Sequence, residues 1–572
     1  MPSAHAALAP LVSAAIERAF GEERRGADPV LRPSQFADLQ SNAALPLAKV
    51  LGIPPREVAQ RIVEALEVDG VCERVEVSGP GFVNLTLAGA WLGTALDELA
   101  ADPRRGAPRA EPQRVVIDYS APNVAKEMHV GHLRTTVVGD ALARVLEHLG
   151  HTVVRQNHIG DWGTPFGMLI ERLLEVGEGS EEALLLETDP NTFYQSARTR
   201  FEGDAAFATR SRERVVALQA GDAETLRLWH ELVDLSRHYF NAIYSRLGIG
   251  LTDDDLAGES TYNDDLERVC DELTEAGIAT VSDGALCVFL EGRTGREGRP
   301  LPLIIRKSDG GYGYATTDLA TVRRRVRDLA ADRMLYVIGA PQSLHLQMVW
   351  ETARLAGWLP DDVEVVHVRI GNVLGPDRKI LRTRSGAPLR LMALLDDAVA
   401  AARAAIDEDR PGLSEEERAA LAPQVGIGAV KYADLSVAHD SEYVFDLERM
   451  VALNGNTSRY LQYAVARTRS IFRHAGVTPG AVVVAEPEER ALALALLDFG
   501  DVVDEVGRTL EPHQLCTYLF DLAQTYSVFY ERCPVLKAEP AVTASRLTLT
   551  GLTRDVLVRG LDLLGIEAPE VM

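Results

Sequence analysis

Two histidines, in the segment His129-Val130-Gly131-His132, are the first candidates for chemistry in this sequence. They follow a short apolar run, Val115 to Ile117, which predicts a buried strand, and a loop from Asp118 to Asn123. Open α/β sheets bind ligands at such strand-to-helix turns, where free N–H groups and a partial positive charge attract phosphate. Both imidazoles share one face of the first helical turn, and Gly131 leaves the backbone open to a flat base. The pattern predicts a nucleotide site, although a His-x-Gly-His segment by itself fits helix capping equally well.

The elements around this turn alternate between strand and helix. A helical segment that ends at Gly150 and the apolar run Thr152 to Val154 complete a βαβ unit. Later patterns predict strands at Leu301 to Ile305, Met334 to Ile338 and Val363 to Ile370, with helical stretches from Thr317 and Leu344 between them. The sequence therefore predicts an α/β fold with one doubly wound, Rossmann-type parallel sheet, interrupted by an insertion at about 171–300.

Two flanking regions differ from this pattern. The first combines a helical segment, Leu8 to Phe20, with a strand-like run, Arg74 to Leu87, and predicts a small α/β domain. Residues Asp102 to Gln113 are rich in Pro, Arg, Gly and Ala, which predicts a linker. From Leu391 onward strand patterns vanish and helical periodicity predicts an all-α bundle. The predicted domains are 1–110, 111–395 and 396–572.

Composition excludes several classes of protein. The chain of 572 residues has no apolar run near the roughly 18 residues that a membrane span requires, and we expect a cytoplasmic location. Its five cysteines include no Cys-x-x-Cys pair and its acids show no metal-ligand spacing, so we expect no protein-bound metal. A net charge of −25 argues against a nonspecific nucleic-acid binder, but basic residues gathered on one face would still permit specific RNA binding.

The segment around the two histidines is similar to a known family over a long stretch. Val115 to Gly167 contains VVIDYSAPNVAKEMHVGHLRTTVVGDALARVLEHLGHTVVRQNHIGDWGTPFG. It resembles the class I aminoacyl-tRNA synthetases, and within them the arginine-specific family. Later segments resemble the same family: FDLERMVALNGNTSRYLQYAVARTRSI, YLFDLAQTYSVFYERCPVL and LTGLTRDVLVRGLDLLGIEAP. The resemblance implies ATP-dependent ligation of L-arginine to the 3′ end of its tRNA through an arginyl-adenylate, with Mg²⁺ entering as the ATP complex.

Arginine presents a planar cation with several N–H donors, which carboxylates bind best. Asp118 and the segment Tyr314-Ala-Thr-Thr-Asp318 offer acids near the nucleotide turn, and Asp318 alone would also fit a helix N-cap. The resemblance places Asp118, Tyr314 and Asp318 around the guanidinium, Asn123 and His129 at the α-amino and carboxylate end, and Gln342 nearby. Asp118 stands where the family often has Glu, so its side chain is one methylene shorter.

A second group of cations lies in the glycine-bounded loop from Gly371 to Gly386 and includes Lys379, Arg382 and Arg384. Its position is similar to that of the Lys-Met-Ser-Lys-Ser loop of class I synthetases, although Leu381 and Thr383-Arg384 depart from that signature. Adenylate formation is attack of the amino-acid carboxylate on the α-phosphate of ATP, and positive charge stabilises the leaving pyrophosphate. The resemblance implies that these three cations act in catalysis together with His129, Gly131 and His132. It also implies that His129, Gly131, His132 and Arg384 bind ATP. A solvated basic loop without function is the alternative.

The flanking domains are the candidates for RNA contacts. Tyr460 and Arg467 lie on one predicted helix on which aromatic and basic side chains are interleaved, as on surfaces that stack unpaired bases. The resemblance implies an anticodon-binding domain with Tyr460, Arg467 and Met572 as contacts to tRNA(Arg). It also implies an N-terminal domain that contacts the outer corner of the tRNA through Phe82 and Asn84. We expect the chain to act as a monomer.

Three alternatives compete with this interpretation. A class I synthetase for a neutral amino acid would not need Tyr314 with Asp318. A nucleotidyltransferase with the same histidine chemistry on a small metabolite would have no use for the helical C-terminal domain. A catalytically inactive RNA-binding relative would not need to keep His129, His132 and Asn123 together.

Overall fold

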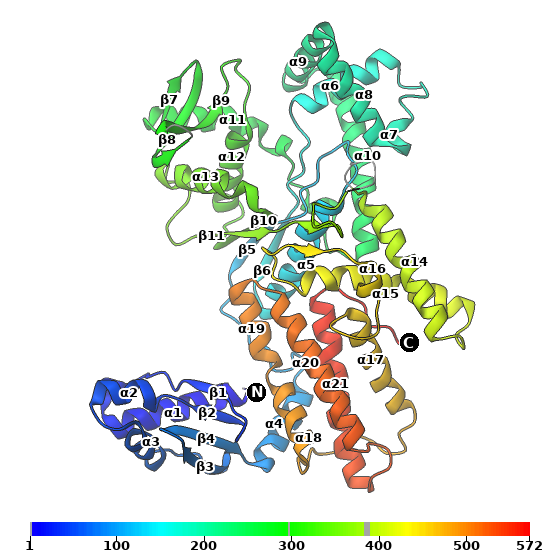
Figure 1. Ribbon diagram of the computed structural model, residues 1–572. Helices are drawn as coiled ribbons and strands as arrows, with labels where there is room; N and C mark the ends of the chain where they lie inside the picture. Colours follow the sequence, from blue (N-terminus) through cyan, green and yellow to red (C-terminus); the bar gives the residue numbers. More distant parts are fainter. Residues whose placement is uncertain (1–2, 296–297, 383–388) are drawn as a thin grey trace. The chain divides into compact units, whose positions relative to one another are not determined.

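The computed structural model describes residues 3–295, 298–382 and 389–572 (Figure 1). The chain forms two compact units, which we describe separately. One unit comprises 110–451 with 564–566, and the other comprises 1–109, 452–563 and 567–572.

A four-stranded parallel sheet forms the centre of the first unit, in the order β11-β10-β5-β6 (Figure 1). The strands are β5 (Arg114–Asp118), β6 (Thr152–Gln156), β10 (Arg333–Gly339) and β11 (Glu364–Ile370). The connecting helices include α5 (Val130–Leu149), α12 (Tyr314–Arg327) and α13 (Ser343–Leu355). The apolar residues of β5 are fully buried, as a parallel strand covered on both faces requires. The predicted βαβ unit and parallel sheet are therefore confirmed.

The predicted strand at Leu301 to Ile305 exists but belongs to another sheet, which corrects the sequence interpretation. It is β9 (Pro300–Arg306), and it pairs antiparallel with β8 (Ala285–Thr294), which pairs with β7 (Ala279–Ser282). The inward residues Leu303 and Ile305 pack into one core with α11 (Asn263–Glu275) and α12. An apolar run indicates that a strand is buried, but it does not identify the strand's partner. Because β9 pairs with β8, the inserted region extends through β9.

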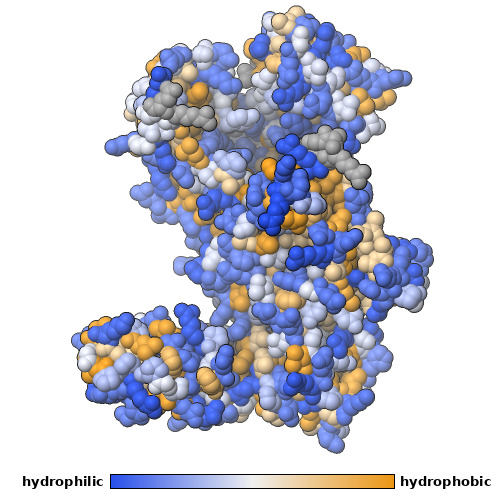
Figure 2. Space-filling model, in the orientation of Figure 1, coloured by the Kyte–Doolittle hydropathy of each residue, from blue (hydrophilic) through white to orange (hydrophobic). Residues whose placement is uncertain are grey.

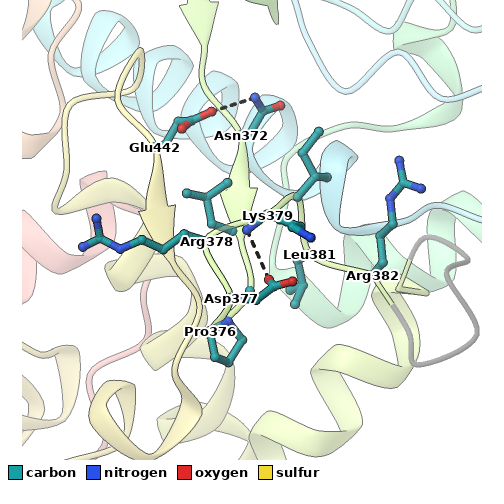
Figure 3. A pocket seen from close by; sticks show the side chains of 11 residues that line it. Asn372, Pro376, Asp377, Arg378, Lys379, Leu381, Arg382 and Glu442 are labelled. Atoms are coloured by element: carbon teal, nitrogen blue, oxygen red, sulfur yellow. Dashed lines mark hydrogen bonds between the residues drawn. The ribbon is translucent and has the colours of Figure 1, made fainter.

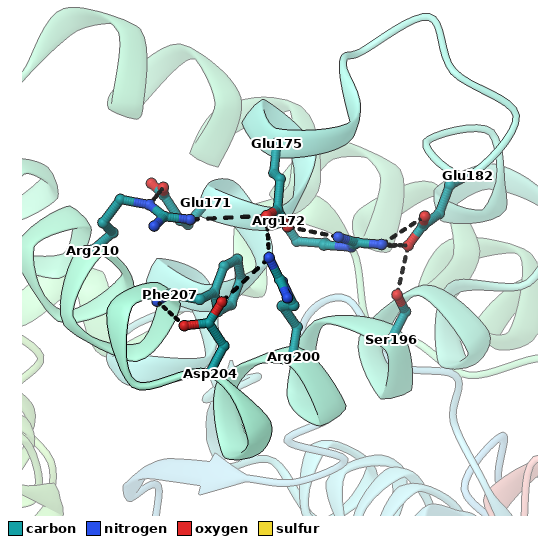
Figure 4. Close-up of polar contacts among 9 residues, drawn as sticks. All are labelled: Glu171, Arg172, Glu175, Glu182, Ser196, Arg200, Asp204, Phe207 and Arg210. Carbon is teal, nitrogen blue, oxygen red and sulfur yellow. Dashed lines mark hydrogen bonds and ion pairs between the residues drawn. The ribbon is translucent and has the colours of Figure 1, made fainter.

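Helices make up the other part of the insertion and gather in a separate lobe (Figure 1). They are α6 (Thr164–Val176), α7 (Leu185–Thr188), α8 (Pro190–Gly203), α9 (Ala205–Gln219) and α10 (Ala223–Leu247). The short helices η2 (Asp253–Asp255) and η3 (Glu259–Tyr262) come next in the chain, and η3 contacts α11 and α12. Ion pairs join α6, α8 and α9; Glu175, for example, contacts Arg172 at 2.6 Å and Arg200 at 2.9 Å (Figure 4). Each guanidinium drawn there has a carboxylate partner, so this surface is charge-balanced and does not suit a phosphate ligand.

The first unit ends with α14 (Leu391–Asp409), α15 (Glu415–Leu435) and α16 (Leu447–Met450). Between α15 and α16 lies β13 (Tyr443–Val444), which pairs in parallel with β12 (Val373–Leu374). The prediction that strands end before Leu391 is therefore wrong at β13. A two-residue strand has no periodicity for a pattern to detect, and only its partner identifies it.

The second unit contains a small α/β domain and a helical bundle. The sheet order is β1-β2-β4-β3, from β1 (Leu31–Pro33), β2 (Leu39–Ser41), β3 (Cys72–Ser78) and β4 (Phe82–Leu87). Its helices are α1 (Ala4–Phe20), η1 (Glu22–Arg24), α2 (Ala44–Leu51), α3 (Pro55–Glu64) and α4 (Gly89–Ala101). The bundle is α17 (Ser458–Arg473), α18 (Pro487–Leu497), α19 (Phe499–Thr509), α20 (His513–Arg532) and α21 (Pro540–Leu563). Arg490 of α18 joins the two parts by pairing with Asp38 at 2.6 Å.

The visible surface is mainly hydrophilic. Figure 2 shows one face of the molecule, on which hydrophilic residues predominate and apolar residues form small separate areas. Within the described residues, none of the helices combines the length and the apolar character that crossing a bilayer would take.

Candidate active site

The two histidines form the N-terminus of α5. His129 is the N-cap residue, and its Nδ1 accepts a hydrogen bond from the Gly131 N–H at 3.0 Å. The Nδ1 of His132 accepts a hydrogen bond from the His129 N–H at 3.1 Å. The ring centres lie 4.1 Å apart, so the two side chains share one face as the spacing predicts. Because both Nδ1 atoms accept, a neutral ring carries its proton on Nε2, which leaves Nε2–H as a donor on each imidazole.

The environment favours the neutral form of both rings. Burial, followed by the neighbouring His129, lowers the pKa of His132 to about 3. Burial, followed by the charge of Lys126, lowers the pKa of His129. The two imidazoles therefore act as hydrogen-bond donors at neutral pH rather than as cations. Lys126 is a cation that the motif analysis missed, and its ammonium lies 4.3 Å from the centre of the Tyr194 ring.

One cavity brings the two predicted catalytic segments together. Its volume is about 260 Å³. It is lined by His129, Gly131, Thr135, Gly339, Pro341, Gly371, Val373, Ile380, Leu381 and Arg382, among others. A Cβ on Gly131 would lie 2.8 Å from Cε1 of His129, so a larger residue would displace the N-cap imidazole. The cavity lies at the carboxyl ends of β10 and β11 and at the N-terminus of α5, the edge at which a doubly wound sheet binds nucleotides.

The loop predicted as the second catalytic segment contains a tight turn, which lines a neighbouring cavity (Figure 3). The Gly375 N–H donates to the Lys379 carbonyl at 2.8 Å, and Asp377 accepts the Lys379 N–H at 3.1 Å. Lys379 is exposed and lines a neighbouring cavity with Glu442, whereas Arg382 lines both cavities. The structure thus brings Arg382, but not Lys379, to the cavity that holds His129. Arg384 lies outside the described residues.

The residues predicted around the guanidinium have different partners. Asp318 lies in the first turns of α12, and its Oδ2 is 2.5 Å from Nε2 of His345 on α13, a hydrogen bond that raises the pKa of His345. Tyr314 opens α12 and is 75% exposed, which leaves its ring open to a ligand. Asp118 is buried and pairs with the equally buried Arg325 at 2.7 Å. Arg325 therefore already supplies a guanidinium to Asp118, while Asp318 remains beside the open surface.

Glu259, in η3, is an acid that sequence reasoning missed. Burial raises the pKa of Glu259 to about 8, and the charges of Asp161 and Asp318 add to the shift. Asp161 is held by the Ser260 N–H at 2.9 Å and by the Ser260 hydroxyl at 2.6 Å. Glu259 also raises the pKa of Tyr314, after burial, so the phenol and the acids share one electrostatic environment. Burial also raises the pKa of Asp161, so a bound cation would favour the ionised form of both acids. The sequence signal for Glu259 was only an acid between Gly258 and Ser260.

The remaining two predicted residues, Asn123 and Gln342, come from two different loops. Asn123 bridges to Gly160 through the backbone, and a Cβ on Gly160 would lie 2.6 Å from the Asn123 Oδ1. The side-chain amide of Asn123 therefore packs against the backbone of Gly160, where a side chain would collide with it. Gln342 is exposed and directly precedes α13, on which His345 holds Asp318.

Comparison with known proteins identifies the family. Residues 96–447 match the model of the catalytic domain of class I (R) tRNA synthetases. Residues 6–87 match the arginyl tRNA synthetase N-terminal domain, and residues 461–572 match the DALR anticodon binding domain. The arginine–tRNA ligase of Thermobifida fusca (strain YX) is 67% identical over 570 residues, covering 99% of each chain. This chain belongs to the arginyl-tRNA synthetase family.

Solved structures of arginyl-tRNA synthetases share the fold. The enzyme from Plasmodium falciparum has a TM-score of 0.84 and 26% identity, with all of both chains covered. The enzyme from Thermus thermophilus has a TM-score of 0.79 and 27% identity, covering 98% of this chain and 99% of the other. The predicted family and the predicted combination of a parallel catalytic sheet, a small N-terminal α/β domain and a helical C-terminal domain are confirmed. Membership of class I implies the use of ATP.

The RNA-contact residues expected of the synthetase family differ in accessibility. In the N-terminal domain, Asn84 is 5% exposed and its Nδ2 donates to the Ser78 hydroxyl at 2.8 Å, while Phe82 is half-buried. In the DALR domain, the Arg467 guanidinium lies 3.9 Å from the centre of the Tyr530 ring. Tyr460 is half-buried, and its hydroxyl oxygen lies 3.3 Å from the hydroxyl oxygen of Ser527.

The C-terminal segment of the synthetase is attached to the same helix. Arg469 of α17 donates to the Ala568 carbonyl at 3.0 Å, and Gln462 donates to the Glu567 carbonyl at 2.8 Å. The terminal residue, Met572, is 7% exposed. Of the expected contacts, Arg467 and Tyr460 are therefore more accessible than Asn84 and Met572.

Proposed function

We propose that this chain uses ATP to activate L-arginine and then esterifies it to the 3′ end of tRNA(Arg). In the first step a carboxylate oxygen of arginine attacks the α-phosphorus of ATP, and the bond to pyrophosphate breaks. In the second step the tRNA hydroxyl takes the arginyl group and AMP leaves. Membership of the family supports the reaction. The observation that supports arginine as the amino acid is the cluster of Glu259 and Asp318 near Tyr314.

The guanidinium is bound by Glu259 and Asp318, with the Tyr314 phenol beside them. A cation in this cluster offsets the mutual repulsion of the acids and favours ionised Glu259, which then accepts charge-assisted hydrogen bonds. Asp118 acts indirectly, since Arg325 occupies its carboxylate. Lysine lacks the planar fork of donors and would leave buried acceptors unpaired, so it is discriminated against.

The opposite end of the substrate lies between Asn123, Gln342 and His129. Asn123 and Gln342 are amides suited to the α-amino group and the carboxylate, because each offers both a donor and an acceptor. His129 lies at the boundary between the amino acid and the nucleotide and can contact either. This arrangement brings the attacking carboxylate to the side of the cavity on which ATP binds.

ATP binds in the cavity above α5. The Nε2–H groups of His129 and His132 donate to α-phosphate oxygens as charge builds up there, and the base lies against Gly131. Arg382, with Lys379 and Arg384, neutralises the leaving pyrophosphate, and Mg²⁺ arrives with ATP. Neutral imidazoles suit this role because they donate without the cost of an additional buried charge.

The tRNA is bound by the other unit, with Arg467 and Tyr460 as anticodon contacts and Phe82 in the N-terminal domain. Asn84 and Met572 complete the predicted set, Asn84 by supporting β4 beside Phe82. We place the reaction in the cytoplasm and propose a monomer that holds no metal of its own.

The test is esterification of labelled arginine, beside lysine and glutamine, onto total tRNA with ATP and Mg²⁺. ATP–pyrophosphate exchange is measured with and without tRNA, because activation in this family is expected to wait for tRNA. Charging of arginine alone supports the proposal. Charging of another amino acid assigns a sister specificity, and tRNA binding without charging assigns a non-catalytic role.

A further inference from the structure

The loop between β5 and α5 contains three side-chain-bearing residues in the left-handed backbone region. Their φ angles are +72° at Ser120, +45° at Ala121 and +58° at Ala125. A Cβ makes this conformation unfavourable, and such residues persist only where surrounding contacts hold them. Strain of this kind in a short loop beside a ligand site requires an identifiable support.

Helix α10 of the insertion supports both ends of the loop. The Tyr244 hydroxyl lies 2.7 Å from Oγ of Ser120, and the Ser236 hydroxyl oxygen accepts the Ala125 N–H at 2.8 Å. Tyr244 is 3% exposed and Ser236 is 7% exposed. Ser236 donates its own proton to the Leu232 carbonyl at 2.9 Å, which turns a lone pair toward Ala125.

The middle of the loop is joined to the same network. Asn157, which follows β6, accepts the Ala121 N–H on its Oδ1 at 3.1 Å and donates from Nδ2 to the Tyr244 hydroxyl at 3.0 Å. Each of the three strained residues therefore has a buried polar contact either with α10 or with an amide that α10 holds. Ser236 and Tyr244 interrupt a stripe of α10 whose other buried members are mostly apolar. Packing alone would not place hydroxyls there.

The strained loop carries Asn123 between its supported ends. Its backbone is fixed on the other side by Gly160, whose N–H donates to the Pro122 carbonyl and whose carbonyl accepts the Val124 N–H, each at 3.1 Å. The chain then continues to the N-cap His129. The position of Asn123 relative to His129 is thus determined by two clamps, β6 with its following loop on one side and α10 on the other.

We propose that Ser236 and Tyr244 are positioning residues for arginine binding, which hold the strained loop so that Asn123 meets the substrate. This inference rests on the proposed function, in which Asn123 contacts the amino-acid end of arginine. It assigns to the insertion helix a role in the activation step itself.

The experiment is arginine-dependent ATP–pyrophosphate exchange with tRNA present, measured for the Tyr244→Phe and Ser236→Ala variants. Each change removes one neutral hydrogen bond to the loop, so KM for arginine should rise about tenfold while KM for ATP stays within about twofold. The effects should be less than multiplicative in the double variant, because both residues hold one loop. Ser245→Ala, an exposed serine on the same helix, is the matched control and should behave as the wild type.

A rescue variant distinguishes positioning from general stability. Ala125→Gly removes the Cβ that makes the left-handed conformation costly, so it should restore part of the affinity for arginine in the Ser236→Ala background. Lowered melting temperatures with an unchanged KM for arginine, or failure of glycine to rescue, would overturn the positioning role. Absence of arginine-dependent exchange in the wild-type protein would instead overturn the proposed function, so the two failures are distinguishable.

Discussion

Burial keeps both kinds of acid–base group in the site close to neutral before substrate arrives. It lowers the pKa of His132 to about 3 and raises the pKa of Glu259 to about 8, because a low-dielectric environment disfavours either charge. For the histidine, this preserves a donor without adding a cation beside Lys126. For Glu259, burial favours the protonated form until a guanidinium binds, and the bound guanidinium then favours the ionised form. Recognition of arginine should therefore depend on pH through Glu259.

The first prediction concerns Glu259. Below its pKa of about 8 this carboxyl is protonated, so KM for arginine should fall about tenfold as the pH rises from about 7 to 9. In Glu259→Gln the carboxylate cannot form, so KM should be about 10- to 100-fold higher than that of the wild type at pH 9. The measurement is ATP–pyrophosphate exchange against arginine concentration at each pH.

The matched control is Glu267→Gln on α11, an exposed glutamate, which should keep the wild-type profile. Comparing variant with wild type removes the titration of the α-amino group of free arginine, which is common to both. A wild-type KM that does not change over this range, or a variant with the same slope, would rule out Glu259 as the guanidinium acceptor.

Site residues that are neighbours in the sequence could be predicted, whereas those brought together only by the fold could not. His129, Gly131 and His132 form one motif, and their geometry follows from the helix start that they build. Glu259 is far from that motif in sequence and becomes notable only through burial near Asp161 and Asp318, which a linear pattern does not contain. The partner of Asp118 was equally hidden, because Arg325 is one of several arginines on α12 and only the fold selects it.

At the scale of elements, the sequence predicted strands better than their pairing. The apolar runs of β5, β10 and β11 identified buried parallel strands, since both faces of each are covered. The run at β9 had the same character but pairs antiparallel within the insertion. Register and sheet membership depend on residues far apart in the chain, so local periodicity cannot supply them.

A short backbone pairing joins the histidine segment to the start of α14. The Val130 N–H donates to the Leu389 carbonyl at 3.0 Å, and the Leu391 N–H donates to the Met128 carbonyl at 2.9 Å. Between them, Arg390 contacts Glu127 and Asp189, each at 2.8 Å. The start of α14, the histidine motif and the start of α8 therefore meet at one guanidinium.

The second prediction tests this junction. In Arg390→Ala, Glu127 and Asp189 lose their shared cation and the backbone pairing loosens, so kcat of exchange should fall about tenfold while KM for arginine stays within about twofold. Arg198→Ala is the control, because Arg198 forms an exposed pair with Glu202 on α8. If Arg390→Ala lowers the melting temperature but not kcat, the junction serves stability only.

At the scale of the whole molecule, the net charge of −25 contrasts with the binding of a polyanion. Association with tRNA must therefore depend on local groups rather than on overall attraction. The candidate RNA contacts belong to one compact unit, and the candidate reaction site belongs to the other. The three family-model matches agree with a division of labour along the chain, although the predicted domain boundaries stay a prediction.

The last prediction follows from that division. Arg467 stacks on Tyr530, an arrangement that presents a flat cation and an aromatic face together, as unpaired bases require. Arg467→Ala should raise KM for tRNA about tenfold in aminoacylation, because it removes a stacking contact, and leave KM for ATP and arginine unchanged at saturating tRNA. Arg508→Ala is the matched control, since Arg508 is exposed and paired with Glu505. Equal changes in KM for tRNA in the two variants would reduce the role of Arg467 to general surface charge, and a change in KM for arginine would show that this helix also affects the reaction site.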